Sequence, residues 1–115
     1  MKIDPTPYFA NHKYDVKKAW LLSIIVKRSK IISVGFNKRM QYWPNRFTKH
    51  SEHDVLDKAG IRAKGADLFI FRLKRDGSFG MARPCKNCFL LIKKAGIVNI
   101  EYTNGIDGMT KERVL

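Results

Sequence analysis

The chain has 115 residues, of which 44% are hydrophobic, so it can build one core and is expected to form a single domain over residues 1–115. Its formal net charge is +13, with 23 Lys and Arg against 10 Asp and Glu, and a field of that sign attracts anions such as phosphates. The chain contains two cysteines, which argues against a small secreted domain stapled by disulfides.

The N-terminal segment and the longest apolar run argue against two further classes of protein. Residues 1–10 lack the apolar region of an export signal. The longest apolar stretch, residues 19–26, is interrupted by Ser23 and is much shorter than the roughly 20 apolar residues that a membrane-spanning helix needs. We therefore expect a cytoplasmic protein with no membrane partner.

The first half of the chain predicts one helix and two strands. Residues 8–18 are expected to form a short helix. Residues 19–27 and 31–36 are apolar runs that predict strands, and the polar residues 28–30 between them indicate a hairpin. Such continuous apolar runs suit strands that are buried on both faces. Residues 37–49 are expected to be a loop.

The second half alternates helices with strands. A helix is expected over residues 50–59, with Ser51 as its capping residue. A strand follows at residues 66–73. A further helix is expected over residues 84–95, because Pro84 suits the first position of a helix.

The C-terminal segment predicts two more strands. Residues 97–103 and 109–115 are expected to be strands, joined by a Gly-rich turn at residues 104–108. This turn leaves no room for a crossover helix, which takes about a dozen residues, so the last strand should run antiparallel to the one before it. Strands alternating with helices predict an α/β fold, in which helices cover the faces of a mixed sheet of about five strands.

Two short motifs carry the chemistry of this sequence, H-S-E at residues 50–52 and P-C-K-N-C at residues 84–88. Each lies at the expected start of a helix, where the helix dipole favours negative charge and therefore thiolates. Zinc binds imidazole nitrogen and thiolate sulfur in tetrahedral geometry, and three protein ligands leave a fourth position for water. We expect His50, Cys85 and Cys88 to be those three ligands.

These residues also allow other interpretations. The C-x-x-C pair alone also fits a redox pair or half of a structural zinc site. A structural site needs a fourth ligand, for which His12 and His53 are the remaining histidines, and His53 lies three residues after His50. A redox pair does not need an H-x-E motif on a separate helix.

Together the two motifs resemble the H-x-E…P-C-x-x-C signature of the cytidine and deoxycytidylate deaminase superfamily. The resemblance extends from about residue 19 to the C-terminus, and the order of the expected elements fits it. It implies a three-layer type of α/β sandwich of the cytidine deaminase kind. It also implies a Zn²⁺ cofactor and release of ammonia by hydrolysis, with Glu52 moving protons between the zinc-activated water and the base.

The resemblance implies substrate contacts at several further positions. Residues 35–37 are similar to a G-x-N segment whose Asn contacts the sugar, which would be Asn37; a strand-ending turn is the alternative. Ser51 stands where many relatives have Ala, and its backbone N–H is expected to meet the base. Arg83 and the following Pro84 are candidate substrate contacts, with Arg83 reaching a phosphate; a plain surface arginine is the alternative.

Two aromatic residues of the expected loop, Trp43 and Phe47, have two interpretations. They either stack on a base or line its pocket, or they pack the loop against the domain. The turn at residues 104–108 resembles that of free cytidine deaminases and favours a small substrate. A homo-oligomer is a further expectation from the family, although the short first helix and the early end of the chain depart from its usual pattern.

The favoured function is hydrolytic deamination of a cytosine-type base in a free nucleoside or nucleotide. The alternative is deamination of cytosine or adenine within single-stranded DNA or RNA. The charge favours this alternative, because eleven Lys and Arg face two Asp in residues 1–50. A third hypothesis is a non-catalytic zinc or nucleic-acid-binding module, against which Glu52 argues.

Overall fold

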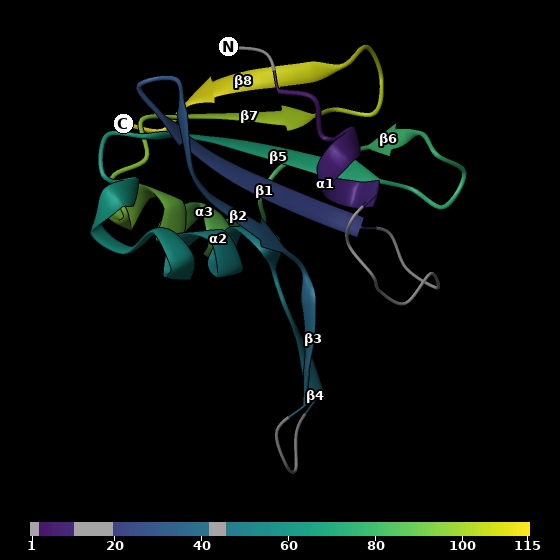
Figure 1. Cartoon of the computed structure of the whole chain (residues 1–115), viewed down its shortest axis with the longest axis horizontal. Coiled ribbons are helices and arrows are strands. Elements are labelled where there is room, and N and C mark those ends of the chain that lie inside the picture. The colour runs from purple at the N-terminus through teal and green to yellow at the C-terminus, as the bar shows by residue number, and fades with distance from the viewer. Residues whose placement is uncertain (1–2, 11–19, 42–45) are drawn as a thin grey trace.

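A computed structural model of the chain describes residues 3–10, 20–41 and 46–115 (Figure 1). Its main sheet has the strand order β2-β1-β5-β7-β8, and a short strand β6 pairs with β5. The strands of this sheet are β1 (Trp20–Lys27), β2 (Lys30–Phe36), β5 (Asp67–Leu73), β6 (Phe79–Gly80), β7 (Asn99–Thr103) and β8 (Met109–Arg113). The other elements are α1 (Thr6–Ala10), β3 (Lys38–Gln41), β4 (Arg46–Lys49), α2 (Ser51–Ala59), the 3₁₀ helix η1 (Gly60–Ala63) and α3 (Lys86–Lys94).

The sheet is mixed, as the sequence predicts. β1 runs antiparallel to β2 and to β5, β5 runs parallel to β7, and β7 runs antiparallel to β8. The β1–β2 hairpin turns at Arg28 and Ser29, whose φ angles of 53° and 61° are those of the tight turn that matches strand twist. The expected first hairpin and the expected antiparallel last strand are both confirmed.

Helices cover both faces of the sheet, which confirms the layered α/β fold (Figure 1). On one face, α2 and α3 pack on a core that includes Ile25 and Ile70, both fully buried. On the other face, Phe9 of α1 packs against Leu22 and Phe71. The two faces alternate along β1 because successive side chains of a strand point to opposite sides. None of the helices in the described ranges is long and apolar enough to cross a membrane.

The segment expected to be a loop, residues 37–49, instead contains a two-stranded ribbon. β3 and β4 pair antiparallel from Lys38↔Lys49 to Gln41↔Arg46, and the ribbon extends away from the main sheet (Figure 1). The expectation was wrong because these strands pair with each other and not with the main sheet. Their sequences therefore lack the apolar runs that mark the strands of the core.

Both site helices begin later than expected. α2 begins at Ser51 with His50 as its N-cap, and α3 begins at Lys86 with Cys85 as its N-cap. Ser51 is therefore not the capping residue, and Pro84 lies before the cap and not at the first helical position. Both N-cap residues have extended backbones and make no side-chain capping bond, so their side chains are available for other contacts.

Two smaller expectations also need correction. The first helix covers Thr6–Ala10, so it begins before the expected range 8–18 and overlaps its first residues; residues 11–19 lie outside the described part of the chain. β1 is buried almost throughout, as expected, but β2 is an edge strand whose first residues are exposed. The short strand β6 was not expected, since two residues give no periodic signal.

Candidate metal centre and active site

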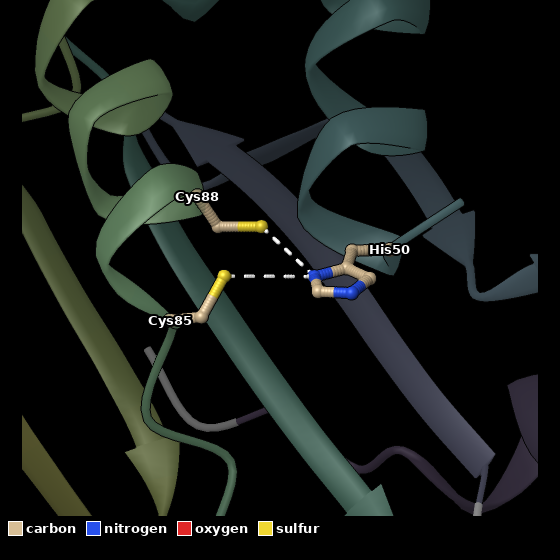
Figure 2. Close-up of side chains that lie close together, drawn as sticks. All are labelled: His50, Cys85 and Cys88. Atoms are coloured by element: carbon tan, nitrogen blue, oxygen red, sulfur yellow. Dashed lines mark hydrogen bonds between the residues drawn. The ribbon is translucent and has the colours of Figure 1, made fainter. Parts of the chain in front are cut away.

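The starts of α2 and α3 bring one histidine and two cysteines together (Figure 2). His50 Nδ1 lies 3.1 Å from Cys88 Sγ and 3.7 Å from Cys85 Sγ. The three ligand atoms all lie within 4.8 Å of one another. Tetrahedral zinc would separate such atoms by roughly 3.5–3.8 Å, given its ordinary bond lengths to nitrogen and sulfur. The donor set and its spacing therefore fit a zinc ion.

His53 is one of the two histidines that were candidates for a fourth zinc ligand. Its Nε2 atom lies 3.7 Å from Asp57 Oδ1 on the exposed side of α2, so His53 is paired with Asp57 and does not join the metal group. The other candidate, His12, lies outside the described residues. Among the described residues, the group has three ligands, which is the number found in catalytic zinc sites with one open position.

Glu52 borders this group from α2. Its side chain is buried, with 5% of its surface exposed. Burial raises the pKa of the Cys88 thiol well above its usual range, and the nearby Glu52 carboxylate raises that pKa further. In the chain without a metal, burial and Glu52 therefore oppose the Cys88 thiolate that the helix start is expected to favour. A bound cation would offset both effects.

The Ser51 hydroxyl is buried and contacts both Glu52 and the main sheet. The Ser51 hydroxyl donates to Glu52 Oε1 at 2.8 Å and lies 2.8 Å from the Ser23 hydroxyl of β1. The serine side chains are fully buried. Sequence reasoning assigned Ser51 through its backbone and missed this contact. The available signal was Ser23 itself, a polar residue inside an apolar strand.

The G-x-N segment fixes the position of α2 against the sheet. A Cβ atom at Gly35 would lie 2.5 Å from the backbone N of Val55 and 2.9 Å from the backbone O of Ser51, so no other residue allows this approach. Asn37 Oδ1 accepts a hydrogen bond from the backbone N–H of Leu21 at 3.0 Å. The Asn37 oxygen therefore helps to hold β1, and its predicted contact with a sugar stays a prediction.

Asp54 is a second anchor of α2. Its carboxylate accepts a hydrogen bond from the Phe36 N–H at 3.2 Å and lies 2.9 Å from Lys58 Nζ. The Asp54 side chain is 3% exposed, so a charge is buried at this junction and paired there. Asp54 thus ties the end of β2 to the helix that carries His50 and Glu52.

Arg83 stands just before the cysteine motif and is paired with the last strand. Its Nε and Nη2 atoms donate to the Glu112 carboxylate at 3.0 and 3.4 Å, and its guanidinium carbon lies 5.8 Å from the Phe89 ring centroid. Arg83 and then the Tyr102 hydroxyl hold the pKa of Glu112 below its ordinary value. The predicted phosphate contact of Arg83 stays a prediction, and it would require release from Glu112.

The remaining predicted substrate positions are only partly described. Pro84 is buried directly before Cys85, beside the metal group. Trp43 and the side chain of Phe47 lie outside the described residues. Their two interpretations therefore stay open.

Comparison with known proteins assigns the class of this molecule. The model of the cytidine and deoxycytidylate deaminase zinc-binding region matches residues 7–104, which include every metal ligand and Glu52. With its three-ligand group, the protein is a zinc-dependent hydrolytic enzyme. The chain belongs to the cytidine and deoxycytidylate deaminase family. The hypothesis of a non-catalytic binding module is thereby set aside. A comparison with curated proteins found no significant match.

Solved structures with the same fold include a dCMP deaminase from the cyanophage S-TIM5. Its apo form is 25% identical, with a TM-score of 0.55, over 76% of this chain and 68% of that chain. Its complex with dCMP and dUMP is 22% identical, with a TM-score of 0.53, over 73% and 65%. RibD of Acinetobacter baumannii is 22% identical with a TM-score of 0.47, and this chain spans 21% of its length.

Proposed function

We propose that this enzyme deaminates a cytosine-type base in a free nucleoside or nucleotide, such as cytidine, deoxycytidine or their monophosphates. The observation that carries the proposal is the group of His50, Cys85 and Cys88 with the buried Glu52 beside it. The cyanophage neighbour, a dCMP deaminase solved with dCMP and dUMP, supports a pyrimidine nucleotide as the substrate. The antiparallel β8 supports a small substrate, because the sequence pattern there resembles that of free cytidine deaminases.

In this proposal His50, Cys85 and Cys88 hold a Zn²⁺ ion, which when bound activates water at its open position. Glu52 takes one proton from the attacking water and delivers it to the ring nitrogen. The water oxygen bonds to the amino-bearing carbon, and the bond from that carbon to the amino nitrogen breaks. Glu52 passes the second water proton to the leaving amino group. One water and one base thus yield the uracil form and ammonia.

The remaining residues orient the substrate in this proposal. Asn37 contacts the sugar, while the backbone N–H of Ser51 and the ring of Pro84 border the base. Arg83 reaches a substrate phosphate after leaving Glu112. A cytoplasmic location and a homo-oligomeric assembly belong to the same proposal.

A polynucleotide substrate is the second candidate, and the β3–β4 ribbon favours it. The ribbon joins Asn37 directly to His50, and its strands carry Lys38, Arg39, Arg46 and Lys49 with no acidic residue. A cationic ribbon beside the active site suits the phosphates of a single strand. In this candidate the enzyme acts on cytosine or adenine within single-stranded DNA or RNA.

A substrate panel tests the proposal. Zinc-loaded protein is incubated with cytidine, deoxycytidine, CMP, dCMP, adenine and guanine nucleosides, and single-stranded oligonucleotides, and both ammonia and the deaminated product are measured. We expect turnover of at least one free cytosine compound, and Glu52→Gln as the matched control should abolish it. Absence of product from every cytosine compound, with zinc bound, would contradict the proposal.

Salt dependence separates the two candidates. A nucleoside has no phosphate, so its KM should hardly respond to salt, whereas affinity for an oligonucleotide falls steeply as each neutralised phosphate releases counterions. The control replaces the four ribbon cations by Gln. Deamination of the oligonucleotide with strong salt dependence that this variant loses would favour the polynucleotide over the free substrate.

A further inference from the structure

A buried chain of three oxygen atoms runs from the sheet to Glu52. Ser23 lies in β1 between apolar neighbours, and Ser51 opens α2; each has 0% of its surface exposed. The two hydroxyl oxygens are 2.8 Å apart, and Ser51 Oγ lies 2.8 Å from Glu52 Oε1. These residues are 28 positions apart in the sequence, so the fold creates this contact.

The chemistry of the groups gives the chain a direction. An ionised carboxylate has no proton and can only accept, so Ser51 donates its single hydroxyl proton to Glu52 Oε1. The Ser51 oxygen must then accept at its contact with Ser23, and Ser23 is the donor there. The hydroxyl protons therefore point from the sheet toward Glu52. Each link strengthens the next because aligned hydrogen bonds polarise one another.

We propose that Ser51, itself held by Ser23, is a positioning residue whose side chain fixes the Glu52 carboxylate beside the metal group. This inference rests on the proposed function, because it assumes that Glu52 transfers protons. It assigns a role to the Ser51 side chain, in addition to the backbone contact proposed for this residue.

A purely structural role is the competing explanation, since the same contact links β1 to α2. The molecule offers a matched control for it. Ser33 of β2 also links the sheet to α2, because its hydroxyl donates to the Val55 carbonyl oxygen at 3.0 Å. Among the described contacts, the Ser33 hydroxyl bonds to Val55 and not to Glu52, so removing this hydroxyl tests the loss of a strand-to-helix hydrogen bond alone.

The experiment compares kcat, KM, zinc content and thermal stability in Ser51→Ala, Ser23→Ala, the double variant and Ser33→Ala. We expect Ser51→Ala to lower kcat on the order of 10- to 100-fold at nearly constant KM and zinc content, because a misplaced catalytic group costs rate and not binding. Ser23→Ala keeps the link to Glu52 and should lower kcat about threefold or less. Ser33→Ala should leave kcat unchanged.

The double variant separates positioning from stability. Ser51→Ala leaves the buried Ser23 hydroxyl without its acceptor, which lowers stability, and the double variant removes that hydroxyl and should recover part of it. Its kcat should stay as low as that of Ser51→Ala. The inference would be overturned if the double variant recovered kcat together with stability. It would also be overturned if Ser51→Ala lost zinc or kept a normal kcat.

The same assay distinguishes failure of the inference from failure of the proposed function. Wild-type protein and Glu52→Gln are measured alongside the serine variants. An active wild type with an inactive Glu52→Gln upholds the proposed function, whatever the serine variants do. Equal turnover in wild type and Glu52→Gln, or none in either, removes the function and the inference together.

Discussion

The starts of α2 and α3 meet at the same metal group but differ in what surrounds them. Each helix has a metal-ligand residue at its N-cap, with a similar extended backbone and no side-chain capping bond. The first turn of α2 buries Ser51, Glu52 and Asp54, whereas the first turn of α3 has no acidic residue and buries Cys88. The two helix starts therefore contribute different residues to the candidate site. The start of α3 carries two of the three candidate metal ligands, and the start of α2 carries the third together with Glu52, the proposed proton-transfer group, and its anchors.

Removing a ligand at the start of α3 should have the largest effect. Cys85→Ser should reduce zinc from about one ion per chain to nearly none, and turnover should disappear with it. Elemental analysis of protein purified without chelator measures this. Asn87→Ala, an exposed change in the same helical turn, is the control and should retain zinc. Full zinc content in Cys85→Ser would contradict the assignment of Cys85, at the start of α3, as a metal ligand.

Removing Glu52 at the start of α2 should separate chemistry from metal binding. Glu52→Ala should keep zinc and fold normally, while kcat falls on the order of 10² to 10⁴, because a positioned acid–base group is worth that much. Parallel zinc analysis and initial-rate kinetics measure the two properties on one preparation. Normal kcat in the zinc-loaded variant would show that Glu52 has no part in proton transfer.

The anchor of α2 at Asp54 should matter to stability. Asp54→Ala removes the acceptor of the Phe36 N–H and leaves Lys58 without this partner. We expect the free energy of unfolding to fall by about 2 kcal/mol, since hydrogen bonds to a buried charge are the costly ones to lose. Urea denaturation measures it, with Asn87→Ala expected to stay within about 0.5 kcal/mol of wild type. Equal effects of the two variants would contradict the contrast between the helix starts.

The ion pair between Arg83 and Glu112 links the segment before α3 to β8. Removing this ion pair should have the smallest effect on stability. The folded chain lowers the pKa of Glu112 from 4.5, so the pair stabilises the fold above that pH and loses this contribution as pH falls through the lowered value. Glu112→Gln should therefore be slightly less stable than wild type at about pH 7, and the difference should shrink at about pH 3. Denaturation midpoints at the two pH values check this, and a constant difference would exclude the linkage.

The group of His50, Cys85 and Cys88 could be predicted because two short sequence motifs contain these residues. H-x-E and P-C-x-x-C keep the ligands close to two helix starts, so spacing alone places them on the correct elements. The antiparallel β8 was predictable for a similar local reason, since a five-residue turn cannot hold a crossover helix.

The features that the sequence did not reveal are of two kinds. They are contacts between residues far apart in the sequence, and strands that do not belong to the main sheet. Ser23 meets Ser51 across 28 positions, and Arg83 meets Glu112 across 29. No local pattern reports such a pair. The β3–β4 ribbon escaped prediction because its strands pair only with each other, apart from the main sheet.

Gly35 has a consequence for how this enzyme tolerates mutation. Its missing side chain lets the backbone of β2 touch the backbone of α2, so no rotamer can adjust to a new atom there. In a mutational scan of the whole chain, position 35 should behave as all-or-none: alanine, usually the mildest substitution, should already displace His50 and Glu52 from the metal group. Buried positions such as Val55 should instead show graded losses, because neighbouring side chains can repack around them. The spacing between the sheet and α2 is thus set by one absent methyl group.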